Sequence, residues 1–267
     1  MEDVNQKPAT SARMYDYYLG GVHNFPADRE AAKIVAEMYP FIPAAARANR
    51  AFLGRAVRTL ADSGVRQFLD LGSGIPTAGN VHEIAQAKAP DARVAYVDID
   101  PVAVSESQEL LRGNANAVAL LADLRDPAAV LDHPAVRKLL DLNRPVGVLL
   151  VSVLHFVLED EQAYGTVEHV LNAVPSGSYL VVSHVAAESF APINEQNPDR
   201  EDVYRRRTAT PGTTRVHAEV TRFFAGLDLL EPGVVRVDEW RPEPGEPGQS
   251  DPERYGAGMW AGVARKP

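Results

Sequence analysis

The sequence predicts an α/β protein in which helices cover both faces of a mostly parallel β-sheet. Three observations predict this class. Short apolar runs begin near residues 67, 93, 117, 146 and 177, several of them end in a carboxylate or a hydroxyl, and helical stretches separate them. Strands that alternate with helices form parallel sheets with right-handed crossovers, and the chain between two such strands must be long enough for a helix.

The N-terminal part is expected to be helical. Pro43 is a good first helical residue, and the stretch that follows it to Leu60 places Leu53, Val57 and Leu60 on one apolar stripe that should pack on the sheet. The arginines of this helix occupy the other positions and are predicted to lie mainly on a solvated face: Arg47, Arg50, Arg55 and Arg58.

The first strand leads into a glycine turn at Gln-Phe-Leu-Asp-Leu-Gly-Ser-Gly, residues 67–74. Gly72 and Gly74 allow positive φ and a close approach of backbone N–H groups to a ligand. Asp70 is placed to accept hydrogen bonds from an ammonium group or a water, which suits a nucleoside that carries an amino acid better than a pyrophosphate. A dinucleotide fingerprint needs a third glycine where Thr77 stands, which argues against NAD. A plain turn is the alternative.

The next two strands also end in carboxylates. Residues 93–101 form a strand that ends in Asp98, 28 positions after Asp70, and Asp98 would hold ribose hydroxyls. Residues 117–126 form the third strand, where the Asp123 side chain and the Leu124 backbone could meet an adenine amino group and ring edge. Asp100 and Asp126, each beside a proline, are interpreted as helix caps.

The fourth strand, within residues 146–155, has Ser152, Leu154 and His155 at its exit. Because ligands of open α/β sheets bind at the carboxyl ends of strands, the four strand ends are expected to converge on one crevice. The fifth strand is expected at residues 177–184, after a helix over Glu159–Val174.

The last third of the chain is less regular. Thr214–Leu227 is expected to be the last crossover helix, followed by a turn and a sixth strand within Leu229–Trp240. The polar stretch Ala187–Gly212, which contains Tyr-Arg-Arg-Arg at 204–207, could cover the pocket or be a plain surface helix and loop. Arg241–Pro252 is rich in proline and glycine and is expected to be a mobile hairpin tip.

These motifs resemble those of the class I S-adenosylmethionine-dependent methyltransferases. The resemblance covers approximately residues 65–265 and rests on Asp-Leu-Gly-Ser-Gly (70–74), Val-Asp-Ile-Asp-Pro (97–101), Ala-Asp-Leu (122–124) and Leu-His-Phe-Val (154–157). Residues 13–25 and 76–83 and the C-terminal Gly-Val-Ala-Arg-Lys-Pro are similar, more narrowly, to a bacterial family of S-adenosyl methyltransferases whose acceptor is unknown. That narrower match spans nearly the whole chain.

The resemblance implies a Rossmann-like, seven-stranded sheet with an antiparallel last strand within Met259–Arg265. It implies that residues 63–267 form an S-adenosylmethionine-binding domain and that residues 1–62 form a helical lid segment, together one structural unit. Its implied cofactor is S-adenosyl-L-methionine. The cofactor contacts expected from it are Tyr15, Asp70, Gly72, Ser73, Gly74, Asp98, Ile99, Asp123, Leu124 and Ser152.

The tyrosine-rich segment at 15–25 suits a lid over a cationic cofactor, because it combines aromatic surface with a flexible turn at Gly20–Gly21. Tyr15 or Tyr17 could face the sulfonium. The alternative is a helix whose tyrosines pack on the sheet and which ends at a glycine cap. Arg13 could pair with the cofactor carboxylate or with Asp16.

Methyl transfer is an in-line displacement that depends on alignment in a dry pocket and needs no protein nucleophile. A base helps when the acceptor is a hydroxyl or an amine, and His155 is the candidate because imidazole titrates near neutral pH. Otherwise His155 is a structural residue beside the adenine. His82 and His23 are weaker candidates. No metal site is expected, since Gln86 stands where His-Glu-x-x-His needs its second histidine.

Composition narrows the compartment and the partners. The 267 residues are 45% hydrophobic and include no cysteine, which excludes disulfides and thiolate sites and fits a reducing cytoplasm. No apolar run approaches the ~20 residues of a membrane span, and the first residues lack a signal-peptide core. A net charge of −9 leaves no global basic field for phosphate backbones, so DNA or RNA would need a local basic patch. We therefore expect a cytoplasmic monomer or homodimer that acts on a small-molecule acceptor.

Two functions remain open from the sequence. The first is an S-adenosylmethionine-dependent methyltransferase that acts on an O or N atom of a small molecule. The alternative is a non-catalytic protein that keeps the fold and the cofactor pocket as a regulatory or interaction module. A nicotinamide oxidoreductase fits less well, because Thr77 replaces a glycine and no Tyr-x-x-x-Lys pair stands in the right region.

Overall fold

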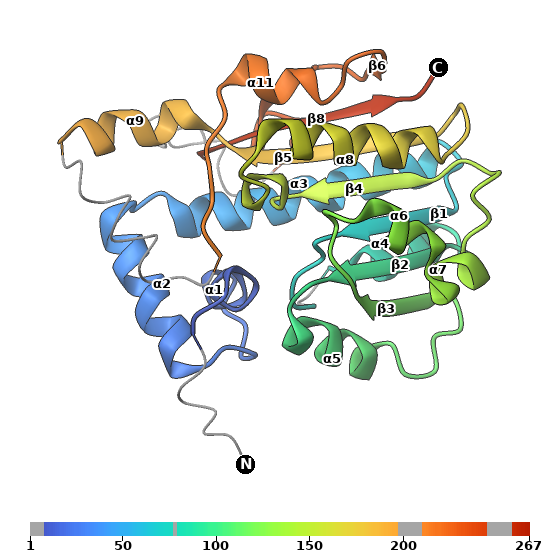
Figure 1. The fold of residues 1–267 in the computed structure, drawn as a ribbon, viewed down its shortest axis with the longest axis horizontal. Coiled ribbons are helices and arrows are strands. Elements are labelled where there is room, and N and C mark those ends of the chain that lie inside the picture. Colours follow the sequence, from blue (N-terminus) through green and yellow to red (C-terminus); the bar gives the residue numbers. More distant parts are fainter. Residues whose placement is uncertain (1–7, 77–78, 197–209, 245–257) are drawn as a thin grey trace.

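The fold is described from a computed structural model that covers residues 8–76, 79–196, 210–244 and 258–267. Its centre is a twisted β-sheet with the strand order β3-β2-β1-β4-β5-β8-β6, and β7 also pairs with β8 (Figure 1). The strands are β1 (Gln67–Leu71), β2 (Arg93–Asp98), β3 (Ala117–Leu121), β4 (Gly147–Val151), β5 (Tyr179–Val185), β6 (Asp228–Leu229), β7 (Val235–Arg236) and β8 (Met259–Arg265).

Strands β1 to β5 are parallel, and β8 is antiparallel to β5, β6 and β7. The mostly parallel sheet with an antiparallel last strand is therefore confirmed. All residues of β1 are buried, as are nearly all of β4 and β5. Strands that are covered on both faces are continuous apolar runs, which is why these segments were recognisable in the sequence.

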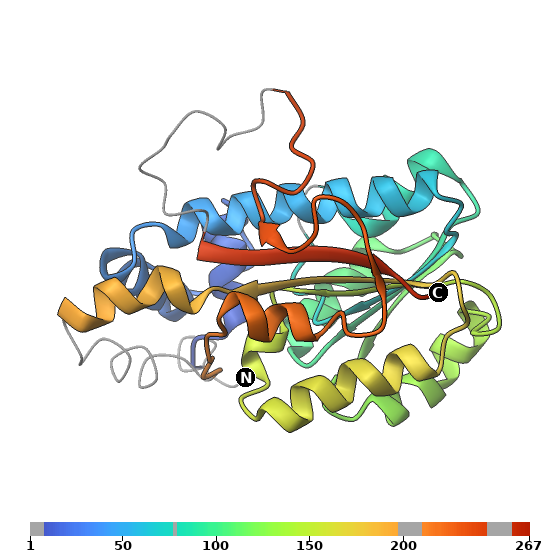
Figure 2. The same cartoon turned by 90° about the horizontal axis from the view of Figure 1, so that it is seen from above.

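Helices cover both faces of the sheet (Figures 1 and 2). One hydrophobic cluster joins the sheet to α3 (Ile42–Asp62) and α4 (Val81–Lys88). The other joins it to α6 (Pro127–Asp132), α7 (Pro134–Leu139), α8 (Asp160–Asn172) and α11 (His217–Arg222). The predicted stripe of α3 is buried at Leu53, Val57 and Leu60.

The two predicted caps are confirmed. Asp100 caps α5 (Pro101–Leu110), since its Oδ1 accepts a hydrogen bond from the Val102 amide at 2.9 Å. Asp126 caps α6 in the same way, with the Ala129 amide at 3.1 Å. Both helices begin with proline directly after the cap, which is the position where a missing N–H costs nothing.

The prediction that Arg55 lies on a solvated face is wrong. Only 3% of Arg55 is exposed, and its guanidinium donates hydrogen bonds to the Trp240 carbonyl at 2.8 Å and the Val237 carbonyl at 2.6 Å. Arg47 is exposed, as predicted, and Arg58 pairs with Glu243 at the surface. Helical periodicity marks the face opposite the sheet, but it does not show that a distant segment covers part of that face.

Two predictions for the C-terminal part are also corrected. The helix predicted over Thr214–Leu227 is limited to the six residues of α11, and the chain reaches Gly226, with φ +76°, through turns. The predicted sixth strand is split into β6 and β7, because the chain turns between them at Gly233, with φ +91°. Three features of the sequence analysis lie outside the described residues: the Tyr-Arg-Arg-Arg run within residues 197–209, Thr77, and most of the predicted hairpin tip.

Three helices stand at the carboxyl-end edge of the sheet: α1 (Ser11–Tyr18), α2 (Pro26–Met38) and α9 (Ala187–Gln196) (Figure 1). A separate apolar cluster joins α1 and α2, and Phe190 of α9 packs against it. In the described part of the chain, no helix has the length and apolar character to cross a bilayer.

Candidate functional site

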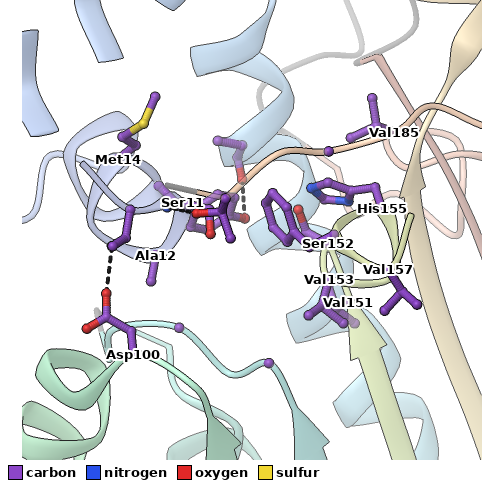
Figure 3. Close-up of a pocket in the computed structure, with 18 of the residues that line it drawn as sticks. Ser11, Ala12, Met14, Asp100, Val151, Ser152, Val153, His155, Val157 and Val185 are labelled. Carbon is purple, nitrogen blue, oxygen red and sulfur yellow. Dashed lines mark hydrogen bonds between the residues drawn. The ribbon is translucent and has the colours of Figure 1, made fainter. Parts of the chain in front are cut away.

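A cavity of about 920 Å³ opens where the parallel strands end, between the sheet and the N-terminal helices (Figure 3). Its volume lies near the upper end of the roughly 300–1,000 Å³ of small-molecule sites. The predicted convergence of four strand ends is confirmed. The ten predicted cofactor contacts and the first candidate base all line this cavity: Tyr15, Asp70, Gly72, Ser73, Gly74, Asp98, Ile99, Asp123, Leu124, Ser152 and His155.

The glycine turn after β1 is held by β2. The amides of Gly72 and Ser73 donate hydrogen bonds to the Val97 carbonyl at 2.8 and 3.1 Å. Gly72 adopts φ +74°, and a Cβ atom there would lie 2.1 Å from a methyl carbon of Val153. Only glycine fits this position, because both the backbone angle and the space exclude a side chain.

Asp98 is buried and holds the turn from the other side. One carboxylate oxygen accepts a hydrogen bond from the Gly74 amide at 2.7 Å, and the other accepts one from the Asp100 amide at 2.8 Å. Burial raises the pKa of Asp98, whereas these backbone hydrogen bonds oppose the rise. Asp98 therefore supports the turn, and a ligand at the strand end would meet the same carboxylate.

Asp70 is 5% exposed and lies near both Arg50 and Asp98. Burial raises the pKa of Asp70 to about 7, with the negative charge of Asp98 adding to the rise and the positive charge of Arg50 opposing it. Without a ligand, the site therefore holds a carboxyl group that is ionised only at a cost. A cation bound beside Asp70 would favour the charged form.

Asp70→Asn is expected to stabilise the ligand-free protein, and more so at high pH. The unfolded chain ionises Asp70 near pH 3.8, but the folded protein ionises it near pH 7. Because the folded-state pKa is raised, the contribution of Asp70 to the free energy of unfolding is fully present below pH 3.8 and is lost as the pH rises to about 7. The thermal midpoint of Asp70→Asn should exceed that of the wild type by roughly 5–10 °C at pH 8, and by clearly less at pH 5.

The measurement is thermal unfolding followed by circular dichroism at both pH values. Asp62→Asn is the matched control, because Asp62 is exposed and pairs with Lys88 at the surface. An equal gain at pH 5 and pH 8 would contradict the assignment of the penalty to Asp70.

The third strand end carries an ion pair. Arg125 donates three hydrogen bonds of 2.6–2.9 Å to the two carboxylate oxygens of Asp123, and the pKa of Asp123 is lowered as a result. A ligand amino group near Asp123 would share this carboxylate with Arg125. Ile99 is 54% exposed at the end of the otherwise buried β2, so it offers apolar surface to the cavity.

The fourth strand end is strained. Ser152 has φ +58°, which is rare for a residue other than glycine, and its amide donates hydrogen bonds to the Ser183 hydroxyl at 2.9 Å and the Ser183 carbonyl at 3.1 Å. Such strain is concentrated at functional sites. The Ser183 hydroxyl in turn donates to Asn49 of α3.

Asn49 is a site residue that the sequence analysis missed. It is buried, lines the cavity and donates a 2.9 Å hydrogen bond to the Tyr15 hydroxyl, which itself donates to the Ala46 carbonyl. Asn49 therefore fixes Tyr15 against the cavity wall. The available signal was an amide between apolar positions of a helix that packs on the sheet.

His155 lies in a short 3₁₀ turn, η2 (Leu154–Phe156), directly after β4. It is 7% exposed and lines the cavity (Figure 3), and its Nδ1 atom has no hydrogen-bond partner among the described residues. Burial, with His184 and Arg215 adding to the effect, holds the pKa of His155 well below its usual value. The ring is therefore neutral near pH 7, and its unpaired Nδ1 atom is buried.

The two weaker candidates, His82 and His23, do not line this cavity. His82 contacts the Tyr96 hydroxyl at 2.8 Å through Nδ1, and His23 pairs with Glu106 at 2.9 Å. Among the residues that the structure describes, no three histidine, cysteine, aspartate or glutamate side chains are grouped so as to hold a metal ion.

Comparison with known proteins identifies the family. The family described as S-adenosyl methyltransferase matches residues 1–267. This chain belongs to that methyltransferase family. The cofactor of the family is S-adenosylmethionine.

Two solved structures are similar to this methyltransferase over nearly its whole length. A DUF574 family protein from Streptomyces avermitilis is 44% identical, with a TM-score of 0.89, and the match covers 99% of this chain and 100% of that one. A candidate methyltransferase from Thermobifida fusca is 40% identical, with a TM-score of 0.87, and the match covers 97% of this chain and 95% of that one. No curated protein matches the chain.

The residues of the cavity fit the cofactor. S-adenosylmethionine carries a sulfonium and an ammonium group, and the cavity presents the buried carboxylates of Asp70 and Asp98 on one wall. His155, on another wall, is neutral. Cations are stabilised by carboxylates and are not opposed by a neutral imidazole.

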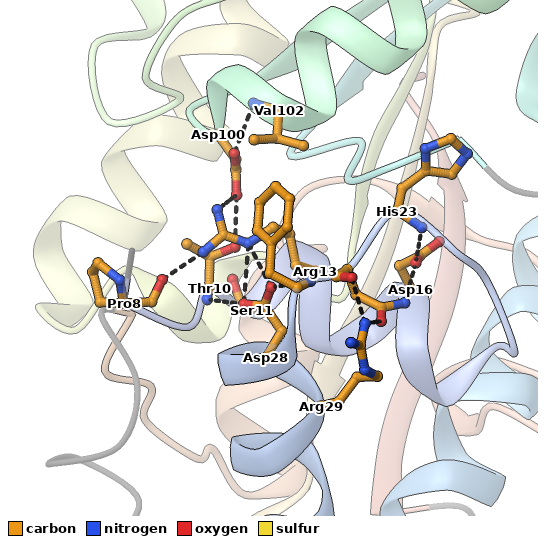
Figure 4. A network of polar contacts seen from close by, with 12 residues as sticks. Pro8, Thr10, Ser11, Arg13, Asp16, His23, Asp28, Arg29, Asp100 and Val102 are labelled. Atoms are coloured by element: carbon orange, nitrogen blue, oxygen red, sulfur yellow. Dashed lines mark hydrogen bonds and ion pairs between the residues drawn. The ribbon is translucent and has the colours of Figure 1, made fainter. Parts of the chain in front are cut away.

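The N-terminal helix α1 of the methyltransferase forms a wall of the same cavity through Met14 and Tyr15, whereas Tyr17 does not line it. Of the two predicted partners of Arg13, Asp16 is wrong, because the side chain pairs with Asp28. Its Nε donates hydrogen bonds to both oxygens of Asp28 at 3.0 and 2.9 Å (Figure 4).

The same network reaches Asp100, which follows β2 (Figure 4). The Thr10 hydroxyl donates a 2.6 Å hydrogen bond to Asp100, and Arg13 lies 3.8 Å from the same carboxylate. Asp16 instead accepts hydrogen bonds from the His23 amide and the Asn24 side chain. These bonds shape the turn that contains Gly20 and Gly21.

A second compartment of the cavity is aromatic. The rings of Tyr39, Phe41 and Phe190 lie 4.8–6.3 Å apart and come from the end of α2, the start of α3 and α9. Other apolar lining residues surround them: Met14, Val35, Ile42, Val185 and Met259. Phe190 was not predicted here, because it lies in a stretch whose composition is polar overall.

Proposed function

We propose that this protein transfers a methyl group from S-adenosylmethionine to an O or N atom of a small-molecule acceptor. The observation that carries the proposal is that one cavity joins the carboxylate-lined strand ends to the aromatic compartment, with the ring of His155 in its wall. Its volume of about 920 Å³ leaves room for an acceptor beside a cofactor.

The proposed roles follow from position. Asp98 binds the ribose hydroxyls, while Asp123 and the Leu124 backbone bind the adenine, beside the apolar side chain of Ile99. Asp70 and the turn at residues 72–74 face the amino-acid end, with Tyr15 opposite, and Ser152 closes the pocket at β4. Residues 1–62 act as a helical lid segment on the domain formed by residues 63–267.

The bound cofactor supplies an electrophilic methyl group. The chain then has to align the acceptor, exclude water and remove a proton from its nucleophilic atom. The aromatic compartment aligns the acceptor and excludes water by burying a largely apolar molecule. His155 accepts the proton at its ring nitrogen, and its low pKa keeps it in the neutral, proton-accepting form at pH 7.

The non-catalytic alternative is not favoured. Family membership supports an enzyme. A module that only senses the cofactor also has no need of a second apolar compartment in the same cavity.

Calorimetric titration with S-adenosylmethionine and, separately, NAD is the first test. We expect binding of the methyl donor only. A panel of phenols and amines is then incubated with protein and cofactor, and formation of S-adenosylhomocysteine is measured. Binding without turnover of any compound in the panel would support the regulatory alternative, and absence of binding would overturn the cofactor assignment.

His155→Gln is expected to lower turnover roughly 100- to 10,000-fold, the range for loss of a general base, and to leave the cofactor Kd unchanged. The measurement is kcat on the best acceptor of the panel, with calorimetry for the Kd. His169→Gln is the matched control, because His169 is exposed on α8 and away from the cavity lining. Full turnover of His155→Gln would show that His155 is structural.

A further inference from the structure

We propose that Arg215 is a positioning residue, which holds His155 in the cavity wall and fixes the tautomer of His184 behind it. The inference concerns the same site and rests on the proposed role of His155. Arg215 lies 60 positions after His155 in the sequence, in the segment that precedes α11, and only 1% of it is exposed.

The guanidinium of Arg215 holds both ends of the turn that carries His155. It donates hydrogen bonds to the Leu154 carbonyl at 3.2 Å and to the Val157 carbonyl at 3.1 Å. It also pairs with Asp160, the first residue of α8, at 2.8–2.9 Å. A planar fork with five N–H donors can make these contacts together, whereas the single ammonium of lysine cannot.

Arg215 also determines which nitrogen of His184 carries the proton. One guanidinium nitrogen lies 2.8 Å from Nε2 of His184, and because arginine can only donate, Nε2 must accept. Nδ1 then carries the hydrogen and donates to the Val185 carbonyl at 2.8 Å. The His184 ring contacts that of His155, with ring centres 5.7 Å apart.

The charge of Arg215 acts on both rings. The ionisable groups around His155 are His184 from β5, Arg215 from the segment before α11 and, through Arg215, Asp160 from α8. Burial and Arg215 lower the pKa of His184 to about 4 against the effect of Asp160, and Arg215 also lowers the pKa of His155. Both histidines stay neutral, so no imidazolium faces the cationic cofactor.

The backbone places Arg215 beside this turn. Its amide donates to the Val185 carbonyl at 3.2 Å, its carbonyl accepts from the Ala187 amide, and Thr213 donates to the carbonyl of His155 at 2.8 Å. The segment at 210–215 therefore runs along the turn, and two of its residues, Thr213 and Arg215, bond to His155 or to the strand behind it.

The test uses the full chain labelled with ¹³C,¹⁵N-histidine. The ring signals of His155 and His184 are followed by NMR between pH 4.5 and 8.5, with His155→Gln and His184→Gln spectra for assignment. In the wild type, we expect His184 to be protonated at Nδ1 and His155 to stay neutral throughout most of this range. In Arg215→Met, His184 should lose its single tautomer and the His155 titration should move up by roughly half a pH unit or more.

Arg215→Lys separates charge from shape. It should keep the His155 titration closer to the wild-type position but lose the fixed tautomer of His184. If Arg215→Met does not fold, the tautomer of His184 in Arg215→Lys decides whether Arg215 fixes it. Arg222→Met is the matched control, since Arg222 is an exposed arginine that stacks on Tyr164. It should change neither signal.

Unchanged His184 tautomer and His155 titration in a folded Arg215 variant would overturn the inference. These readouts need neither cofactor nor acceptor, so they remain valid if the calorimetric test of the proposed function fails. If an acceptor is found, Arg215→Lys should lower kcat at least tenfold while the cofactor Kd changes less than threefold. A fall in cofactor affinity alone would also contradict a positioning role at His155.

Discussion

Arg13→Met is expected to destabilise the folded protein by about 3–5 kcal/mol, the range for removal of one partner from a buried ion pair. Asp28, its partner, has no exposed surface, and among the described residues it keeps only the backbone amides of Thr10 and Phe25 as donors once the guanidinium is gone. An uncompensated carboxylate in this environment is costly. The measurement is urea unfolding at pH 7, read by circular dichroism.

The matched control for Arg13→Met is Arg29→Met. Arg29 belongs to the same network (Figure 4) but is only half-buried and bonds to Asn24 rather than to a carboxylate. We expect a loss of about 1 kcal/mol or less. The double variant Arg13→Met/Asp28→Asn should be less destabilised than the sum of its single variants, because no unpaired charge remains. Strict additivity would contradict the ion-pair explanation.

Asp98→Ala is expected to weaken S-adenosylmethionine binding about tenfold to several hundredfold. Loss of a charged hydrogen bond to the ribose accounts for about 1–3 kcal/mol, and each 1.4 kcal/mol is a factor of ten in Kd. The structure adds a second cause, since the Gly74 and Asp100 amides lose their acceptor and the turn loses its support. The Kd is measured by calorimetry.

Two variants separate these causes. Asp98→Asn keeps an acceptor for one amide but removes the charge, so its affinity should lie between those of the wild type and Asp98→Ala. Asp126→Ala is the control, because Asp126 is a helix cap outside the cavity lining, and its Kd should equal that of the wild type. Wild-type affinity in Asp98→Ala would remove Asp98 from the cofactor site.

The strands and the site residues at their ends were predictable because they depend on local patterns. A strand buried on both faces needs a continuous apolar run, and Gly72, Asp70 and Asp98 stand at fixed offsets from such runs. The helix caps at Asp100 and Asp126 follow the same logic. Helix length was less predictable at α11, where turns take over from Phe223 to Gly226.

The sequence by itself determined the class of fold, the strand ends that form the cavity and the family. Only the tertiary structure decided the partners of the buried arginines: Arg13 with Asp28, Arg55 with the chain near Trp240, and Arg215 with the turn of His155. The aromatic compartment, which joins the end of α2 to α9, belongs to the same category. The physical reason is that a charged or aromatic residue has the same local pattern whether it faces water or a distant segment, and only long-range packing distinguishes the two.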